Sequence, residues 1–247
     1  MRRSVLHSPL MWALAGGTLL AAAGVTAYGV RGRSASLFGP SVWRGDRTRP
    51  ALALTFDDGP SEATPRVLEI LARYGVPAAF FQCGVNAERL PRIAREVAAA
   101  GHEIGNHGYS HAALYLRAPG FIARELGRAQ SAIAGVTGSV PVYFRAPYGA
   151  RWFGLGAVQR RLGLLGVMWT TLALDWKLPS GRIAARLLRG ACNGAIFCLH
   201  DGRELRPDPD IGETLAALRS VIPQLADRGY RFETVSAILG RPAHAAA

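Results

Sequence analysis

Two adjacent carboxylates, Asp57 and Asp58, stand in the stretch TFDDGP directly after the apolar run ALAL. Like charges this close disfavour each other's ionisation, so a buried pair requires a cation or another compensating group nearby. Neighbouring side chains of a strand point to opposite faces, so one aspartate could instead cap a helix while the other faces solvent. Gly59 and Pro60 turn the chain at this point. The stretch alone is compatible with a capped turn or with one part of a metal site.

Two histidines four residues apart, His107 and His111, stand in the stretch HGYSH. On a helical turn, both imidazoles would lie on one face and reach one metal ion. Two imidazoles and one carboxylate form a ligand set of catalytic zinc sites that leaves a coordination position for water. We therefore predict that this pair binds a metal ion if the fold brings a carboxylate of TFDDGP to it.

Four further residues that could take part in chemistry also follow apolar segments. Arg145 lies in RAPYG, Asp175 and Trp176 lie in LDW, and His200 lies in CLHD. Taken alone, each has an ordinary structural explanation, such as a salt bridge, a loop cap or a hydrogen-bonded histidine at a strand end. Their shared position after apolar segments is what indicates a site.

The elements that must position these residues alternate between strands and helices. Helices are predicted over Thr64–Tyr74 and 90–98, where apolar residues recur at helical spacing. Seven strands alternating with helices predict one α/β domain of parallel βα units, as a closed barrel or an open doubly wound sheet. In both architectures a functional site lies beyond the C-terminal ends of the strands. The predicted strands are Ala51–Phe56, Ala78–Gln82, Glu103–Asn106, Val142–Arg145, Leu165–Trp169, Ala195–Leu199 and Tyr230–Glu233.

The five motifs TFDDGP, HGYSH, RAPYG, LDW and CLHD, in this order, resemble those of the polysaccharide deacetylase family, also called the NodB-homology domain or carbohydrate esterase family 4. The resemblance covers about residues 50–240. It implies an α/β fold, a distorted (β/α)7 barrel similar to a TIM barrel. It also implies an enzyme that removes acetyl groups from carbohydrate polymers or oligomers, most often from N-acetylglucosamine units. The expected cofactor is one divalent metal ion, most often zinc, with cobalt, nickel and manganese as alternatives.

The resemblance also assigns roles to individual residues. Asp58, His107 and His111 match the metal ligands of the family. Asp57 matches the general base that activates the metal-bound water for attack on the acetyl carbonyl. The metal would neutralise Asp58 and so reduce the cost of keeping Asp57 ionised. Arg145 matches the residue that holds Asp57 in place.

The remaining assignments concern the leaving group and the acetyl group. His200 matches the general acid, which an amide substrate needs because its nitrogen leaves only when protonated. Asp175 is expected to orient the imidazole of His200 and favour its charged form. The backbone N–H of Tyr148 matches the donor to the oxyanion. Trp176 and Leu199 match apolar residues that enclose the acetyl methyl group.

One position departs from the family pattern, and two other functions remain open. Gly108 stands where the family more often has Ser or Thr, from which we expect a change in loop support and not in metal binding. An O-acetyl polysaccharide esterase is the alternative within the same class. A non-catalytic glycan-binding module of the cell envelope is the alternative from a different class.

The N-terminal residues predict export. Arg2 and Arg3 precede an uncharged stretch over 8–30, which Arg31 and Arg33 close. Its length and polarity fit a signal peptide, with AAA at 21–23 and VTA at 25–27 as cleavage patterns, or a membrane anchor. The chain would then face outward from the cytoplasmic membrane or be secreted or periplasmic. The predicted organisation is 1–30 signal peptide or anchor, 31–50 linker, 51–240 catalytic domain and 241–247 tail.

Composition and cysteine usage limit the partners. The net charge is +12, but the arginines are scattered along the chain without clustered aromatic residues, so nucleic acid is not an expected partner. The expected partners are an acetylated glycan and, with an uncleaved N-terminal segment, the membrane. Cys83, Cys192 and Cys198 lack the spacing of a cysteine metal site. A disulfide between Cys192 and Cys198 remains open, as does the oligomeric state.

Overall fold

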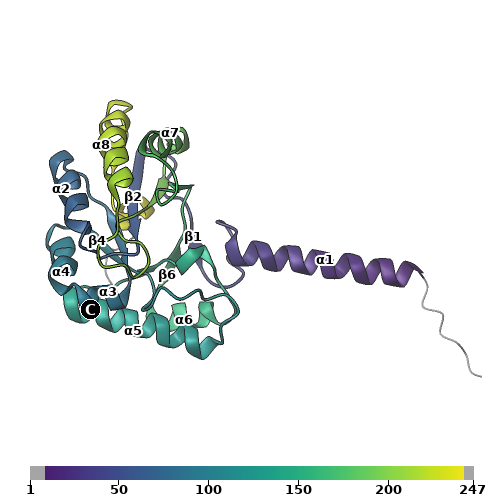
Figure 1. The fold of residues 1–247 in the computed structure, drawn as a ribbon. Helices are drawn as coiled ribbons and strands as arrows, with labels where there is room; N and C mark the ends of the chain where they lie inside the picture. The colour runs from purple at the N-terminus through teal and green to yellow at the C-terminus, as the bar shows by residue number, and fades with distance from the viewer. Residues whose placement is uncertain (1–8, 242–247) are drawn as a thin grey trace, which may run out of the picture.

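Parallel strands alternate with helices along residues 9–241, which are the residues that this computed structural model describes (Figure 1). The strands are β1 Ser41–Val42, β2 Ala51–Asp57, β3 Ala79–Gln82, β4 Glu103–Asn106, β5 Tyr143–Phe144, β6 Leu165–Val167, β7 Thr171–Leu172, β8 Ala195–His200 and β9 Arg231–Phe232. The helices are α1 Pro9–Arg31, α2 Thr64–Tyr74, α3 Gly84–Arg89, α4 Pro91–Ala99, α5 Pro119–Thr137, α6 Leu155–Leu162, α7 Ser180–Gly190, α8 Gly212–Asp227 and α9 Val235–Leu239, with a 3₁₀ turn at Pro147–Gly149.

The strands form one curled sheet in the order β1-β6-β5-β4-β3-β2-β8-β7. β1 and β7 are the end strands of this order and do not pair with each other within the described residues, so the sheet curls without closing. β9 pairs with the start of β2, at Ala51 and Leu52, before the pairing of β2 with β3 begins at Thr55. The predicted distorted barrel is therefore confirmed as a curled half-barrel of parallel strands with helices on its outer side.

All seven predicted strands are present, and two short strands were missed. The missed strands, β1 and β7, have two residues each and are only half-buried, so they carry no apolar run that a sequence pattern could detect. The helix predicted over Thr64–Tyr74 is α2 with the same bounds.

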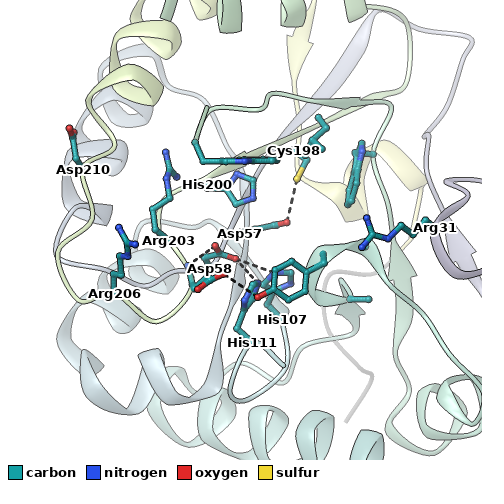
Figure 2. Close-up of a pocket in the computed structure, with 17 residues that line it drawn as sticks. Arg31, Asp57, Asp58, His107, His111, Cys198, His200, Arg203, Arg206 and Asp210 are labelled. Atoms are coloured by element: carbon teal, nitrogen blue, oxygen red, sulfur yellow. Dashed lines mark hydrogen bonds and ion pairs between the residues drawn. The ribbon is translucent and has the colours of Figure 1, made fainter. Parts of the chain in front are cut away.

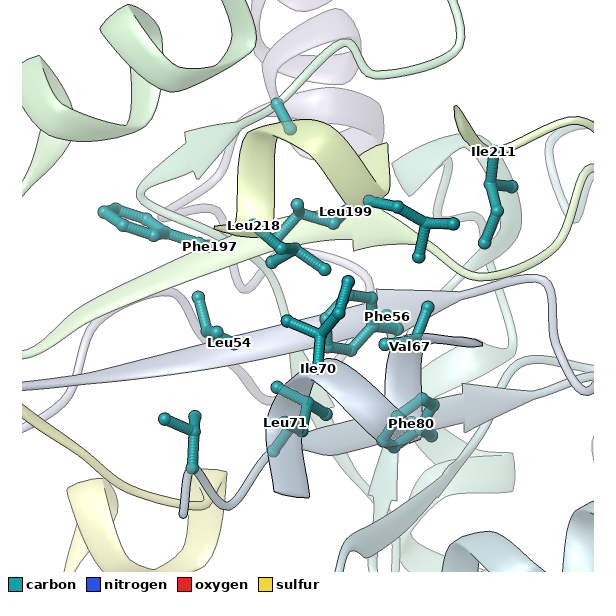
Figure 3. Packing of buried hydrophobic residues seen from close by; sticks show 14 of the residues in the cluster. Leu54, Phe56, Val67, Ile70, Leu71, Phe80, Phe197, Leu199, Ile211 and Leu218 are labelled. Atoms are coloured by element: carbon teal, nitrogen blue, oxygen red, sulfur yellow. The ribbon is translucent and has the colours of Figure 1, made fainter. Parts of the chain in front are cut away.

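Strand β2 is buried along its whole length, and its two faces differ in character. Leu54 and Phe56 pack on the helix-covered side, where α2 and α8 close the main core (Figure 3). Phe56 stacks on Phe80 of β3 at a centroid distance of 5.0 Å. Thr55 and Asp57 alternate with these residues and therefore face the inside of the half-barrel. The core thus fixes which residues at the end of β2 reach the interior.

Residues 31–50, for which we predicted a linker, pack on the domain instead. Ala35 and Phe38 are buried, and the guanidinium of Arg151 donates hydrogen bonds to the backbone carbonyls of Gly32 and Ala35. β1 then adds to the edge of the sheet by pairing with β6. Several of these contacts join backbone carbonyls of the segment to side chains distant in sequence, which its glycine- and proline-containing composition does not indicate.

Helix α1 extends away from the half-barrel, and only its last residues contact the domain (Figure 1). Among the helices of residues 9–241, none combines the length and apolar character needed to cross a membrane. The signal peptide or anchor over 1–30 stays a prediction, and its first eight residues lie outside the described range. Residues 242–247 of the predicted tail also lie outside it.

Replacing Phe56 by alanine tests the packing between sheet and helices. The substitution leaves a cavity in the main core, so we expect Phe56→Ala to lower the free energy of unfolding by about 3–5 kcal/mol in urea denaturation. Phe153→Ala is the matched control and should cost less, because the Phe153 side chain is already 58% exposed. Equal losses for both variants would contradict the assigned core.

Candidate metal centre and catalytic cavity

A cavity of about 680 Å³ lies at the C-terminal ends of the strands, beyond the last residues of β2 and β8 (Figure 2). Seven of the ten residues predicted for the site line this cavity: Asp57, Asp58, His107, His111, Tyr148, Trp176 and His200. Arg145 and Asp175 are buried behind it and contact residues of its wall. The fold therefore brings together nine of the ten predicted residues.

Asp58, His107 and His111 form a buried group suited to a metal ion. Asp58 Oδ1 lies 3.3 Å from His107 Nε2 and 3.1 Å from His111 Nε2, and the three potential ligand atoms lie within 4.8 Å of one another. His107 Nδ1 lies 2.8 Å from the carbonyl oxygen of Arg145, which accepts a hydrogen bond from the Nδ1–H and leaves Nε2 free to act as a ligand. This donor set fits one divalent metal ion with open positions for other ligands.

The two histidines meet through a loop and not through a helical turn, so the predicted helical geometry is wrong. His107 follows β4 directly, and Gly108 and His111 both have positive φ values, 77° and 53°. The Gly108 N–H donates to Asn106 Oδ1 at 2.8 Å. Asn106 thus holds the loop at this point without any side chain at position 108.

Both oxygens of the Asp58 carboxylate have polar partners. Oδ1 faces the two imidazoles, and Oδ2 accepts a hydrogen bond from the backbone N–H of Glu204 at 2.8 Å. Burial opposes ionisation of this carboxyl, but its hydrogen bonds with His107 and His111 outweigh burial and hold its pKa well below the usual range. Asp58 is therefore ionised at neutral pH, as a metal ligand must be.

Asp57 is compensated by a different set of groups. Arg145, which is fully buried, donates from Nη1 to Asp57 Oδ1 at 2.7 Å and to Thr55 Oγ1 at the same distance. The second oxygen, Oδ2, accepts a hydrogen bond from the thiol of Cys198 at 3.3 Å. The charge-assisted bond to Arg145 fixes the carboxylate, and the thiol is a weak donor. Asp57 therefore keeps a basic oxygen at the cavity.

His200 and Asp175 form a buried ion pair. Asp175 Oδ1 lies 2.8 Å from His200 Nδ1, and its Oδ2 accepts from the backbone N–H of His200 and from Thr214 Oγ1. Burial lowers the pKa of His200, but the charge and hydrogen bond of Asp175 outweigh it and raise the pKa to about 9. The imidazole is therefore charged below pH about 9, with Nε2 as the nitrogen left for the cavity.

Leu199, predicted to enclose an acetyl methyl group, does not reach the cavity. It is fully buried in the core between the sheet and the helices (Figure 3). Residues of a strand alternate between its faces, so the cavity wall contains the neighbouring Cys198 and His200. Trp176 does line the cavity, and its ring meets that of His200 edge to face at 4.9 Å.

Four contributors were missed in the sequence: Thr55, Cys198, Glu204 and Thr214. Thr55 and Cys198 each precede a predicted site residue by two positions in a strand, so period-two alternation could have identified them. Glu204 contributes through its backbone N–H and Thr214 from the first turn of α8, and no sequence pattern marks either contact. The three cysteines are all free, so the open disulfide between Cys192 and Cys198 is absent.

Comparisons with known proteins identify relatives of this chain in sequence and in structure. The family model for polysaccharide deacetylase matches residues 44–167. A chitooligosaccharide deacetylase of Azorhizobium caulinodans is 36% identical over 76% of this chain and 93% of its own length. The crystal structure of the Bc1960 peptidoglycan N-acetylglucosamine deacetylase superposes with a TM-score of 0.76 at 29% identity, over 83% of this chain and 94% of that one. A CE4 family pseudoenzyme from Bacillus anthracis superposes with a TM-score of 0.74 at 26% identity, over 82% and 70% of the two chains.

Removing one imidazole tests the metal centre directly. Loss of an outer contact to a metal ligand typically weakens metal binding about 10–100-fold, so His111→Ala, which removes a ligand, should weaken it by more than about 100-fold. Zinc titration followed by calorimetry measures the affinity. His102→Ala is the control, because His102 lies outside the group and donates no ligand atom to it. Unchanged zinc affinity in His111→Ala would contradict the assignment.

The ion pair can be tested through the titration of His200. In Asp175→Asn the strongest attraction that raises the pKa of His200 is lost while burial remains, so its pKa should fall well below the value of about 9. The imidazole resonances of His200 in NMR report the midpoint. Asp210→Asn changes another carboxylate of the cavity and should leave the midpoint unchanged. An unshifted midpoint in Asp175→Asn would show that the pair does not control His200.

Proposed function

This chain belongs to the polysaccharide deacetylase family, and from that premise we propose that it hydrolyses N-acetyl groups of a carbohydrate polymer or oligomer with the help of one divalent metal ion. The observation that carries the proposal is the separate compensation of two adjacent aspartates. Asp58 faces two imidazoles, whereas Asp57 is held by Arg145. One carboxylate is thereby available to a metal ion and the other to a proton.

The metal would be held by Asp58, His107 and His111. When bound there, a divalent ion such as zinc acidifies a water molecule and polarises the acetyl carbonyl. The chain orients this donor set through the Arg145 carbonyl on His107 and the Glu204 N–H on Asp58. The buried carboxylate and imidazoles support zinc, and cobalt, nickel or manganese are compatible with the same oxygen and nitrogen donors.

Asp57 is the proposed general base. Its Oδ2 takes the proton from the attacking water, while Arg145 keeps Oδ1 in place. A carboxylate that is fixed by a buried guanidinium cannot rotate away, so its basic oxygen stays directed at the water. Positioned proton transfer of this kind contributes about 10²–10⁴-fold to a rate.

His200 is the proposed general acid. Its Nε2 donates a proton to the amide nitrogen as the carbon–nitrogen bond breaks, and Asp175 holds the ring through Nδ1. The raised pKa of His200, about 9, keeps this proton available at neutral pH. Trp176 encloses the acetyl group beside this ring, and the backbone N–H of Tyr148 is the proposed donor to the carbonyl oxygen as it becomes negative.

Asp57→Asn tests the role of Asp57 as the base without changing the ligands of the proposed metal centre. The amide keeps the shape of the side chain but cannot accept the proton, so we expect kcat/KM to fall by at least about 100-fold. The zinc bound at one equivalent of added metal, measured by elemental analysis, should stay at the wild-type value because Asp58 and the imidazoles are unchanged. Near-normal turnover in Asp57→Asn would show that the base is another group.

The same cavity could hydrolyse an O-acetyl ester, and His200 distinguishes the two substrates. An ester oxygen leaves more readily than an amide nitrogen, so an N-deacetylase needs the acid more. We expect His200→Ala to reduce kcat on an N-acetylated glycan more than on an activated acetyl ester, by about 10-fold or more. Equal losses of kcat on both substrates would contradict the assignment of His200 as the general acid.

Acetate release from a panel of glycans tests the proposed function itself. The panel comprises chitin oligomers, peptidoglycan, poly-N-acetylglucosamine and acetylxylan, each with and without a chelator. Release from an N-acetylated glycan that stops with chelator and returns with zinc supports the proposal. Release from acetylxylan alone would favour the esterase. No release from metal-loaded protein that still binds a glycan would favour a non-catalytic module.

We also propose that the chain acts outside the cytoplasm. The support is the uncharged stretch over 8–30 between arginines. Cell fractionation followed by mass analysis of the N-terminus tests the proposal. A new N-terminus near residue 24 or 28 in an extracytoplasmic fraction indicates cleavage, and an intact Met1 in the membrane fraction indicates an anchor. An intact chain in the cytosol would contradict export.

A further inference from the structure

A second group of potential metal ligands lies beside the first, on two neighbouring strands. Asp57 ends β2, and Cys198 and His200 lie on β8. Asp57 is paired in register with His200, and Cys198, two residues earlier, lies on the same face of its strand. One carboxylate oxygen, the sulfur and one imidazole nitrogen of this group lie within 4.8 Å of one another.

The donor atoms of this group point toward one another at the cavity (Figure 2). The Cys198 thiol already contacts Asp57 Oδ2 at 3.3 Å, and Arg145 occupies only the other oxygen, Oδ1. Asp175 holds Nδ1 of His200 at 2.8 Å, so Nε2 is the ring nitrogen left on the cavity side. All three residues line the cavity, so an ion that enters it can reach the group.

We propose that Asp57, Cys198 and His200 form a second, inhibitory binding site for a thiophilic divalent cation such as Zn²⁺ or Cd²⁺. A thiolate, an imidazole and a carboxylate are the three ligand types of protein zinc sites, and three such ligands leave one position open to the cavity. The sulfur makes the group selective, because a thiolate favours soft metals over Mg²⁺, Ca²⁺ and Mn²⁺. The Asp58 group contains no sulfur and lacks this selectivity.

Binding of a cation at the second site is accompanied by the release of protons from its ligands. The cation forms bonds to Cys198 Sγ, His200 Nε2 and Asp57 Oδ2, and the thiol proton and the Nε2 proton pass to water. Arg145, in contact with Asp57, adds repulsion for a cation. The second site therefore binds more weakly than the Asp58 group and fills when metal is in excess.

The functional consequence rests on the proposed function, whereas the binding itself does not. A cation in the second site occupies the basic oxygen of Asp57 and the acidic nitrogen of His200 together. Deacetylation therefore stops although the first metal stays in place. The protein would be activated by one equivalent of zinc and inhibited by excess zinc.

Titration with Cd²⁺ tests the binding without reference to activity. The full chain, loaded with one equivalent of zinc, is titrated with Cd²⁺ while the sulfur-to-cadmium charge-transfer absorption and the bound metal are measured. We expect an additional equivalent of metal and a charge-transfer band in the wild type. Both should be lost in Cys198→Ser and in Cys198→Ala, which is the second variant if the serine disturbs the strand. Cys192→Ser, which removes the partly exposed cysteine elsewhere, should keep both.

A charge-transfer band of unchanged strength in both Cys198 variants, or no band in the wild type, would contradict the proposal of a second site.

The inhibitory role of the second site is tested separately by acetate release in excess zinc. Inhibition of the wild type, and at least a 10-fold higher zinc concentration for half-inhibition in Cys198→Ser, supports it. A normal band with no inhibition of active protein would overturn the inhibitory role. Absence of deacetylation at every zinc concentration, with a normal band, would instead reject the proposed function.

Discussion

Two buried carboxylates on adjacent residues are the constraint on which the rest of the structure depends. Burying a charge costs several kcal/mol unless it is paired, and two like charges beside each other increase that cost. The chain compensates them separately: His107 and His111 face Asp58, and Arg145 faces Asp57. This separation gives neighbouring residues different chemistry, because one is available to a metal ion and the other to a proton.

The half-barrel makes this arrangement by converging strand ends. β2 supplies both aspartates and lies between β3 and β8, so groups from strands on either side reach the same cavity. His200 comes from β8, the histidine pair follows β4, and Arg145 follows β5. Arg145 connects the two halves of the site, since its side chain holds Asp57 and its carbonyl oxygen orients His107. Loss of this residue would disturb the proposed base and the metal centre together.

Strands and site residues that depend on long apolar segments or on a distinctive motif could be predicted from the sequence. All seven predicted strands and nine of the ten predicted site residues are where they were expected, because apolar runs end at the polar residues of the cavity. Predictions that depend on the direction of a side chain or on backbone contacts were less successful. Leu199 was assigned to the cavity although strand alternation places Cys198 there, and the histidine pair is formed by positive φ values that no spacing rule indicates. The packing of 31–50 depends on contacts with Arg151 that are distant in sequence.

The division of work between the two aspartates is tested most directly by a crystal structure of the protein loaded with one equivalent of zinc. Anomalous scattering at the zinc edge locates the ion. The account predicts one peak bound by Asp58 and by Nε2 of His107 and His111, with the Asp57 carboxylate still in contact with Arg145. A zinc ion ligated by Asp57 in place of Asp58, or bound outside this group at one equivalent, would contradict it.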